Sequence, residues 1–62
     1  MTLDSELEER ARNLEALAKS AEKNRDFDSA ARFYRKAAEA YGRAGWGEKS
    51  ETCYKIAEII DD

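Results

Sequence analysis

The chain has 62 residues, which gives room for one domain over residues 1–62 and a small margin of stability, because so short a chain buries only roughly 60% of its unfolded surface. Apolar residues make up 42% and charged residues 40%, which is too apolar for a disordered chain and typical of helical proteins. A net charge of −3 without an extended basic cluster argues against nucleic-acid binding, and no apolar run approaches the roughly 20 residues needed for membrane insertion.

The cysteine and glycine content indicates a cellular location and one structural boundary. Cys53 is the single cysteine, so no internal disulfide can form, and the glutamate-rich N-terminal segment is unlike a signal peptide. We therefore expect a cytoplasmic protein. Glycine occurs only within residues 42–47 and proline is absent, so the strongest break in the backbone is expected there.

Apolar residues recur every three or four positions at the start of the chain and predict a first helix over residues 5–24. Ser5 followed by Glu8 fits a capping box at its beginning. Opposite charges four residues apart predict ion pairs on its exposed side, namely Glu6–Arg10, Glu8–Arg12 and Glu15–Lys19. The apolar stripe that should face the core comprises Leu7, Ala11, Leu14, Leu17 or Ala18, and Ala21.

A second helix is predicted over residues 27–43, with Asp26 accepting a hydrogen bond from its first free backbone N–H groups. Gly45 is the expected residue of left-handed conformation just beyond its end. The inner stripe is broad and rich in small residues, which lets neighbouring helices approach closely. It comprises Phe27, Ala30, Tyr34, Ala37, Tyr41 and Ala44, widened by Ala31 and Ala38.

A third helix is predicted over residues 48–60, with one apolar face made by Cys53, Ile56, Ala57 and Ile60, and with Tyr54 and Ile59 beside it. Short connections make helices that follow one another antiparallel neighbours. The fold class predicted from the sequence is therefore all-α, with three antiparallel helices.

The residues of the chain indicate no enzyme, metal site or cofactor site. Histidine is absent, Cys53 has no base near it in sequence, and no glycine-rich phosphate loop is present. We expect Cys53 to be a buried small hydrophobe, and Tyr34, Tyr41 and Tyr54 to be core residues whose hydroxyl groups reach water. Trp46 is interpreted either as an interface anchor or as a ring that covers Tyr41 or Ile60.

The first two predicted helices share a series of spaced residues: Leu14, Leu17, Ala18, Ala21, Asp26, Phe27, Asp28, Ala30, Tyr34, Ala37 and Glu39. This series, within about 11–44, resembles a tetratricopeptide repeat, a helix-turn-helix unit of about 34 residues. The resemblance implies that Ala18 and Ala30 lie where the paired helices cross. Arg25 departs from the pattern, because the family has glycine in this turn.

The resemblance also implies a site for a protein or peptide partner. The groove-lining positions of a tetratricopeptide repeat fall on one side of the first helix, at Arg12, Glu15, Lys19, Glu22 and Lys23. An ordinary solvated face with ion pairs within the helix is the alternative interpretation of these residues.

Two more specific resemblances concern the arrangement of the third helix. The segments 34–41 and 53–58, with Gly45 between them, are similar to the soluble NSF attachment proteins, which are membrane-fusion adaptors built of related helices. Microtubule-interacting and trafficking domains, which are closed three-helix bundles, are the second choice. A third helix stacked on the second would favour the former, and one packed against both others would favour the latter.

We therefore expect a non-enzymatic interaction or adaptor module that holds an amphipathic helix of a partner in a groove between two helices. This hypothesis is motivated by apolar residues on the second and third helices that exceed what one helix–helix contact can bury. They are Ala31, Phe33, Ala40, Ile56 and Ile59. The alternative is a structural element that forms a symmetric helical homodimer through an apolar edge of the first helix made by Leu3, Leu7, Leu14 and Leu17.

Overall fold

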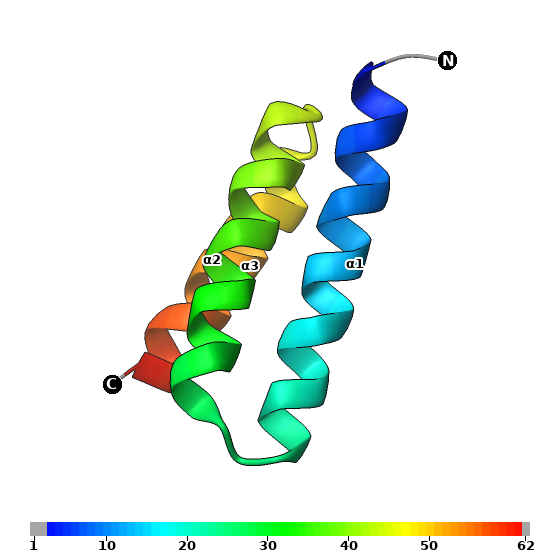
Figure 1. Ribbon diagram of the computed structural model, residues 1–62. Coiled ribbons are helices and arrows are strands. Elements are labelled where there is room, and N and C mark those ends of the chain that lie inside the picture. The colour runs from blue at the N-terminus through cyan, green and yellow to red at the C-terminus, as the bar shows by residue number, and fades with distance from the viewer. Residues whose placement is uncertain (1–2, 62) are drawn as a thin grey trace.

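A computed structural model describes residues 3–61, which form three helices, α1 Leu3–Lys23, α2 Phe27–Arg43 and α3 Gly47–Asp61, with no strand among them. Successive helices run in opposite directions (Figure 1). The predicted all-α, three-helix fold is confirmed, and each helix boundary lies within two residues of its predicted position. The side chains of residues 1–4 lie outside the description, so the predicted apolar contribution of Leu3 lies outside it as well.

The helix α2 is the centre of the fold. Both α1 and α3 pack along α2, whereas α1 and α3 scarcely meet. In Figure 1, α3 accordingly lies behind α2 while α1 stands beside it. The described chain is therefore an open arrangement of three helices around α2, not a bundle in which every helix contacts both others.

The start of α1 differs from the prediction. Because the helix begins at Leu3, Ser5 lies within its first turn and cannot act as the residue that precedes the helix. The predicted capping box at Ser5 and Glu8 is therefore wrong. Two of the predicted ion pairs are present, Glu8–Arg12 at 2.6 Å and Glu15–Lys19 at 3.8 Å.

The turn after α2 ends the helix as predicted. Gly45 has φ +88°, its N–H donates to the Gly42 carbonyl at 3.1 Å, and the Trp46 N–H donates to the Tyr41 carbonyl at 2.8 Å. This pair of hydrogen bonds is the Schellman motif, which satisfies carbonyl groups that the end of a helix leaves without partners. The Trp46 carbonyl then accepts from the Ser50 N–H at 2.9 Å and begins α3.

The turn after α1 repeats this geometry without glycine. Arg25 takes the left-handed conformation, with φ +61°, and its N–H donates to the Glu22 carbonyl, while the Asp26 N–H donates to the Ala21 carbonyl at 2.9 Å. The Asp26 side chain accepts from the Ser29 N–H at 3.4 Å, which confirms its predicted role as the cap of α2. Because a left-handed conformation costs an L residue roughly 1–2 kcal/mol, the backbone is strained at Arg25.

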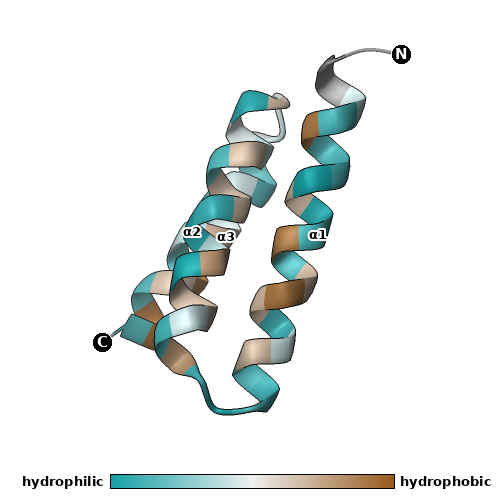
Figure 2. Ribbon diagram, in the orientation of Figure 1, coloured by the Kyte–Doolittle hydropathy of each residue, from teal (hydrophilic) through white to brown (hydrophobic). Residues whose placement is uncertain are grey.

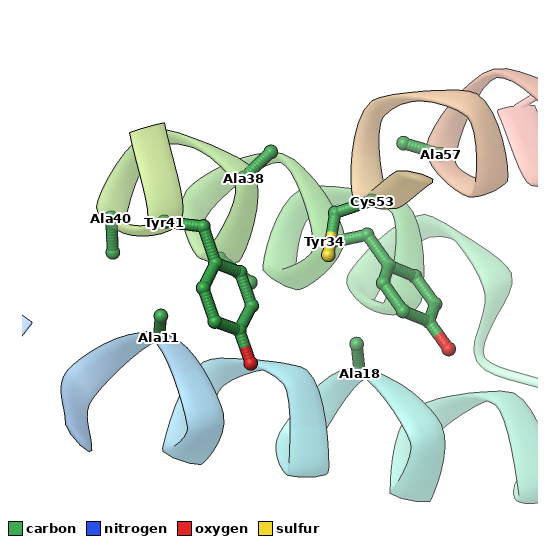
Figure 3. Packing of buried hydrophobic residues seen from close by; sticks show 9 residues of the cluster. Ala11, Ala18, Tyr34, Ala38, Ala40, Tyr41, Cys53 and Ala57 are labelled. Atoms are coloured by element: carbon green, nitrogen blue, oxygen red, sulfur yellow. The ribbon is translucent and has the colours of Figure 1, made fainter. Parts of the chain in front are cut away.

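The core consists mainly of small side chains. Nine of the twelve buried hydrophobic residues described are alanines, and the others are Tyr34, Tyr41 and Cys53. Figure 3 shows both tyrosine rings projecting from α2 toward α1, where Ala11 and Ala18 point back at α2. Alanines let the helix axes approach closely, and the rings fill the space between them.

The large aliphatic side chains lie at the edges of this core. Every described leucine and isoleucine is half-buried or exposed, and Leu17 and Ile59 are 49% and 76% exposed. Hydrophobic positions recur along α1 with hydrophilic ones between them (Figure 2). Two predicted core residues are wrong, because Phe27 is 49% exposed in the first turn of α2 and Tyr54 is 45% exposed on α3.

Candidate binding surfaces

One flank of the contact between α1 and α2 is closed by two matched hydrogen bonds. The Tyr34 hydroxyl donates to the Glu22 carboxylate and the Tyr41 hydroxyl donates to the Glu15 carboxylate, each at 2.7 Å. The two tyrosines are seven residues apart on α2, and the two glutamates are seven residues apart on α1. We call these four residues the tyrosine flank. The two tyrosines lie two helical turns apart on α2, and so do the two glutamates on α1. The two hydrogen bonds therefore fix one antiparallel register of the helices.

Burial and neighbouring charge make the tyrosine flank costly to ionise. Burial raises the pKa of Tyr34 and Tyr41 well above that of free tyrosine, and the hydrogen bonds to Glu22 and Glu15 raise it further. Lys49 of α3 stands 5.6 Å from the centre of the Tyr41 ring, a cation–π distance. The flank thus holds its hydroxyl groups protonated and packed, which suits a structural contact.

Cys53 is buried, as the sequence predicted, and lies beside Tyr34 in Figure 3. Burial raises the pKa of its thiol, and the nearby charge of Glu15 raises it further, more than Lys49 and Lys19 offset. A thiol with a raised pKa is a poor nucleophile at neutral pH. Cys53 therefore acts as a small core residue.

The predicted groove-lining residues occupy one side of α1 and have unequal environments. Glu15 and Glu22 are half-buried acceptors of the tyrosine hydroxyls, whereas Arg12, Lys19 and Lys23 are exposed. A hollow of about 390 Å³ that includes Arg12 is otherwise lined by Ser5, Glu8 and Glu9 of the same helix. Two of the five residues thus join α1 to α2, a role that the sequence analysis did not assign to them.

Trp46 stands in the turn between α2 and α3. Its ring centre is 6.4 Å from that of Tyr41, with the ring planes tilted by 49°. The ring therefore partly covers Tyr41, which is one of the two residues that the sequence suggested for this contact. The ring is still 41% exposed and lines a hollow of about 380 Å³ with Gly45, Gly47, Glu48 and Lys49. The predicted contact of Trp46 with Tyr41 is therefore present, and its role as an interface anchor stays a prediction.

The other flank of the α1 and α2 contact is open. A hollow of about 230 Å³ lies between the two helices, with an apolar floor of Leu7 and Leu14 from α1 and Ala40 from α2. Charged side chains surround the floor: Arg10, Lys36, Arg43 and one carboxylate, Glu39. An apolar floor with charged edges is the usual form of a surface that receives an amphipathic segment.

The open flank continues along α1. A second hollow, of about 500 Å³, shares Arg10 and Leu14 with the first and adds Leu17, together with Glu6, Glu9 and Asn13. We call the combined surface the leucine face. It comprises residues of both helices: Leu7, Arg10, Leu14 and Leu17 of α1, bordered by Glu6, Glu9 and Asn13, with Lys36, Glu39, Ala40 and Arg43 of α2.

Sequence reasoning found the leucines but not the surface that they form. Leu7, Leu14 and Leu17 were assigned either to the core stripe or to a dimer edge, and the participation of α2 was missed. A usable signal was present, because Ala11 and Ala18 already supply a seven-residue repeat of small residues for close packing on α2. Leucines next to such a repeat lie at the edge of the helix contact.

Comparisons place no further constraint on the site. Among the described residues, no group of three His, Cys, Asp or Glu side chains could hold a metal ion, and none of the helices is both long and apolar enough to cross a membrane. No model of a protein family matches the sequence, and no significant match was found among curated proteins or among solved structures.

Proposed function

We propose that this protein is a non-enzymatic, cytoplasmic interaction module of tetratricopeptide type that binds an amphipathic helix of a partner protein on its leucine face. The observation that carries the proposal is the position of the large aliphatic residues. The core is filled by alanine, tyrosine and cysteine, whereas Leu7 and Leu14 border an interhelical hollow and Leu17 lines the adjoining hollow on α1. An apolar side chain gains about 1.5–3 kcal/mol from full burial, so the leucines gain most when a partner covers them.

The charges of the leucine face define the chemistry of the partner. Arg10, Lys36 and Arg43 carry positive charge at the edges of the interhelical hollow, against one carboxylate, Glu39. Glu6 and Glu9 line only the second hollow. A bound helix would place apolar side chains over Leu7 and Leu14 and carboxylates toward these cations. Such charges set the orientation and association rate of a partner more than its affinity.

Packing supports the tetratricopeptide resemblance. Ala18 and Ala30 are fully buried, as expected for residues at a helix crossing, and Ala37 is fully buried as well. Because α3 packs on α2 and scarcely touches α1, the arrangement favours the attachment-protein type over a closed bundle of the microtubule-interacting type. The predicted contribution of Ala31 to a free surface is wrong, because Ala31 is buried, whereas Ala40 is buried except for the small part that lines the interhelical hollow. Phe33 and Ile56 are half-buried and Ile59 is exposed.

The proposal is tested by titrating the isotope-labelled protein with a synthetic amphipathic helical peptide, followed by amide chemical shifts. The peptide carries leucine at alternating three- and four-residue steps and glutamate at flanking positions. We expect saturable shifts at the leucine face, around Leu14, Leu17 and Ala40, and no comparable shifts around Arg12, Lys19 and Lys23 on the other side of α1. Raising the salt concentration should weaken the binding because the edge charges are exposed.

The control peptide has the same leucines with lysine in place of glutamate, and should bind more weakly. A matched pair of variants localises the contact: Leu17→Glu should weaken binding, and Ala16→Glu, which adds the same charge at an exposed neighbour on another side of α1, should not. Shifts that map instead to Arg12, Lys19 and Lys23 would move the site to the predicted groove. Absence of saturable shifts with either peptide would refute the proposed function.

A further inference from the structure

The exposed surface of α3 combines apolar and acidic side chains. Ile59 is the most exposed large hydrophobic residue described, at 76%, and Tyr54 is 45% exposed. Around them stand the exposed carboxylates of Glu48, Glu51 and Glu58. We call these five residues the acidic face of α3. Cys53 and Ala57 attach the opposite side of the helix to the core.

Few cations offset the charge of this surface. Lys55 pairs with Glu51 at 3.4 Å, and Lys49 lies against the Tyr41 ring. Three glutamates against two lysines leave this surface with an excess of one negative charge beside the exposed Ile59. The interhelical hollow of the leucine face has the opposite character, because Arg10, Lys36 and Arg43 outnumber its one carboxylate, Glu39, around an apolar floor. Glu6 and Glu9 line only the second hollow. The acidic face of α3 and the interhelical hollow are therefore complementary in charge, and both carry apolar side chains.

We infer that the leucine face receives α3 of a second copy of this chain, so that the protein associates head to tail. The inference rests on the proposed function, because it names the amphipathic helix that the leucine face binds. The acidic face of α3 would lie on the leucine face of the next copy, with Ile59 over Leu14 and Leu17 and with Glu58 near the cations of the edge.

A single copy cannot satisfy this contact within itself, since α2 separates the two surfaces. The Ser50 hydroxyl of α3 donates to the Ala38 carbonyl at 2.8 Å, which places α3 on the Ala38 side of α2. Lys36, Glu39 and Arg43, which line the hollow, project from other sides of the helix. Each copy therefore retains one free donor surface and one free acceptor surface, and the contact repeats from copy to copy as in any heterologous association.

The experiment is sedimentation equilibrium of the full chain over a wide concentration range, with the helical circular-dichroism signal recorded on the same samples. We expect a mean mass that rises from 7.1 kDa past twice that value as concentration increases, and that falls when salt is added. Two variants each remove one surface: Ile59→Lys on α3, and Leu17→Glu on α1. Both residues are exposed enough for the helical signal of the monomer to persist.

Mixing the two variants is the decisive measurement. Each variant alone should be monomeric, but Leu17→Glu keeps its acidic face and Ile59→Lys keeps its leucine face, so the mixture should form a one-to-one dimer that grows no further. Ala16→Glu should associate like the parent chain.

Two other outcomes would overturn the inference. A mean mass that stops at twice the monomer and survives Ile59→Lys would show the symmetric homodimer through α1 that the sequence suggested as an alternative. A parent chain that stays monomeric at every concentration would remove self-association altogether. In both cases the peptide titration decides separately whether the leucine face binds a helix.

Discussion

The two flanks of the contact between α1 and α2 are built from different chemistry. On the tyrosine flank, two rings fill the space between the helices, and their hydroxyl groups donate hydrogen bonds to carboxylates of α1. On the leucine face, long aliphatic side chains border a hollow of about 230 Å³ that no segment of the described chain fills. The first flank is completed within one chain, whereas the second offers apolar surface to a partner.

This difference separates the residues that stabilise the fold from those that we assign to binding. A buried tyrosine with its hydroxyl group bonded contributes both packing and a satisfied polar group, so its loss is felt in folding. The leucines of this face keep part of their surface exposed in the free protein, with Leu17 at 49%, so the loss of Leu17 should be felt mainly in association. Substitutions on the two flanks should thus separate stability from binding.

The largest effect is expected for Tyr41→Ala. Tyr41 is 1% exposed and is the largest of the fully buried side chains, so truncation leaves a cavity and removes the donor to Glu15. We expect a loss of about 3–5 kcal/mol in the free energy of unfolding, enough to unfold much of a chain this small. Urea denaturation of the monomer measures it. Tyr54→Ala is the matched control because Tyr54 is exposed, and an equal loss there would contradict the distinction between core and surface tyrosines.

Alkaline pH should weaken the same flank. Since the folded chain holds the pKa of Tyr34 and Tyr41 above the free value of 10.0, the folded state binds these protons more tightly than the unfolded state does. Stability from this source is complete below pH 10 and falls as the pH rises above it. Denaturation at pH 8 and pH 11 should show a larger difference for the parent than for the double variant Tyr34→Phe, Tyr41→Phe. An equal difference in both proteins would exclude the tyrosine hydroxyls as its cause.

The sequence predicted the helices well because their signals are local. The spacing of Ala30, Tyr34, Ala37 and Tyr41 indicates a helix, and Asp26 and Gly45 mark boundaries with a known geometry. These signals depend on neighbours within a few residues, so they remain valid whatever the helices pack against. The prediction at Ser5 was wrong because the helix begins two residues earlier, at Leu3. A serine followed three residues later by a glutamate looks the same in the sequence whether it precedes a helix or lies in its first turn.

The candidate site was harder to predict because it depends on the rotation of one helix against another. A small rotation of α1 about its axis would decide whether Leu14 or Ala18 is central in the contact with α2. The apolar stripe that the sequence predicts for this helix contains both residues. In the structure Ala18 is fully buried and Leu14 is displaced to the edge. The bonds from Tyr34 to Glu22 and from Tyr41 to Glu15 link residues far apart in the sequence, so no local pattern identifies them.

The turns before and after α2 affect both flanks, because they set the position of α2 relative to α1 and α3. Gly45→Ala should cost about 1 kcal/mol, since alanine in the left-handed conformation is strained although nothing lies within 4 Å of the added carbon. Arg25→Gly should stabilise by a smaller amount, about 0.5 kcal/mol, because relief of strain is partly offset by the greater freedom of glycine in the unfolded chain. Thermal unfolding measures both effects. Opposite signs are required, and two losses would mean that the Arg25 side chain contributes to the fold.

The smallest change in stability is expected for Leu17→Ala, which removes an aliphatic side chain from the leucine face. Leu17 is 49% exposed in the free chain, so the free energy of unfolding of the monomer should change by no more than about 0.5 kcal/mol, and alanine is a better helix former. Binding of the glutamate-flanked peptide should nevertheless weaken, because the part of Leu17 that is exposed in the free chain becomes buried in the complex. Denaturation and peptide titration of the same variant test the two halves of this statement. A variant that loses stability as strongly as Tyr41→Ala would show that the leucine face belongs to the core, and binding of parental strength would place the contact elsewhere.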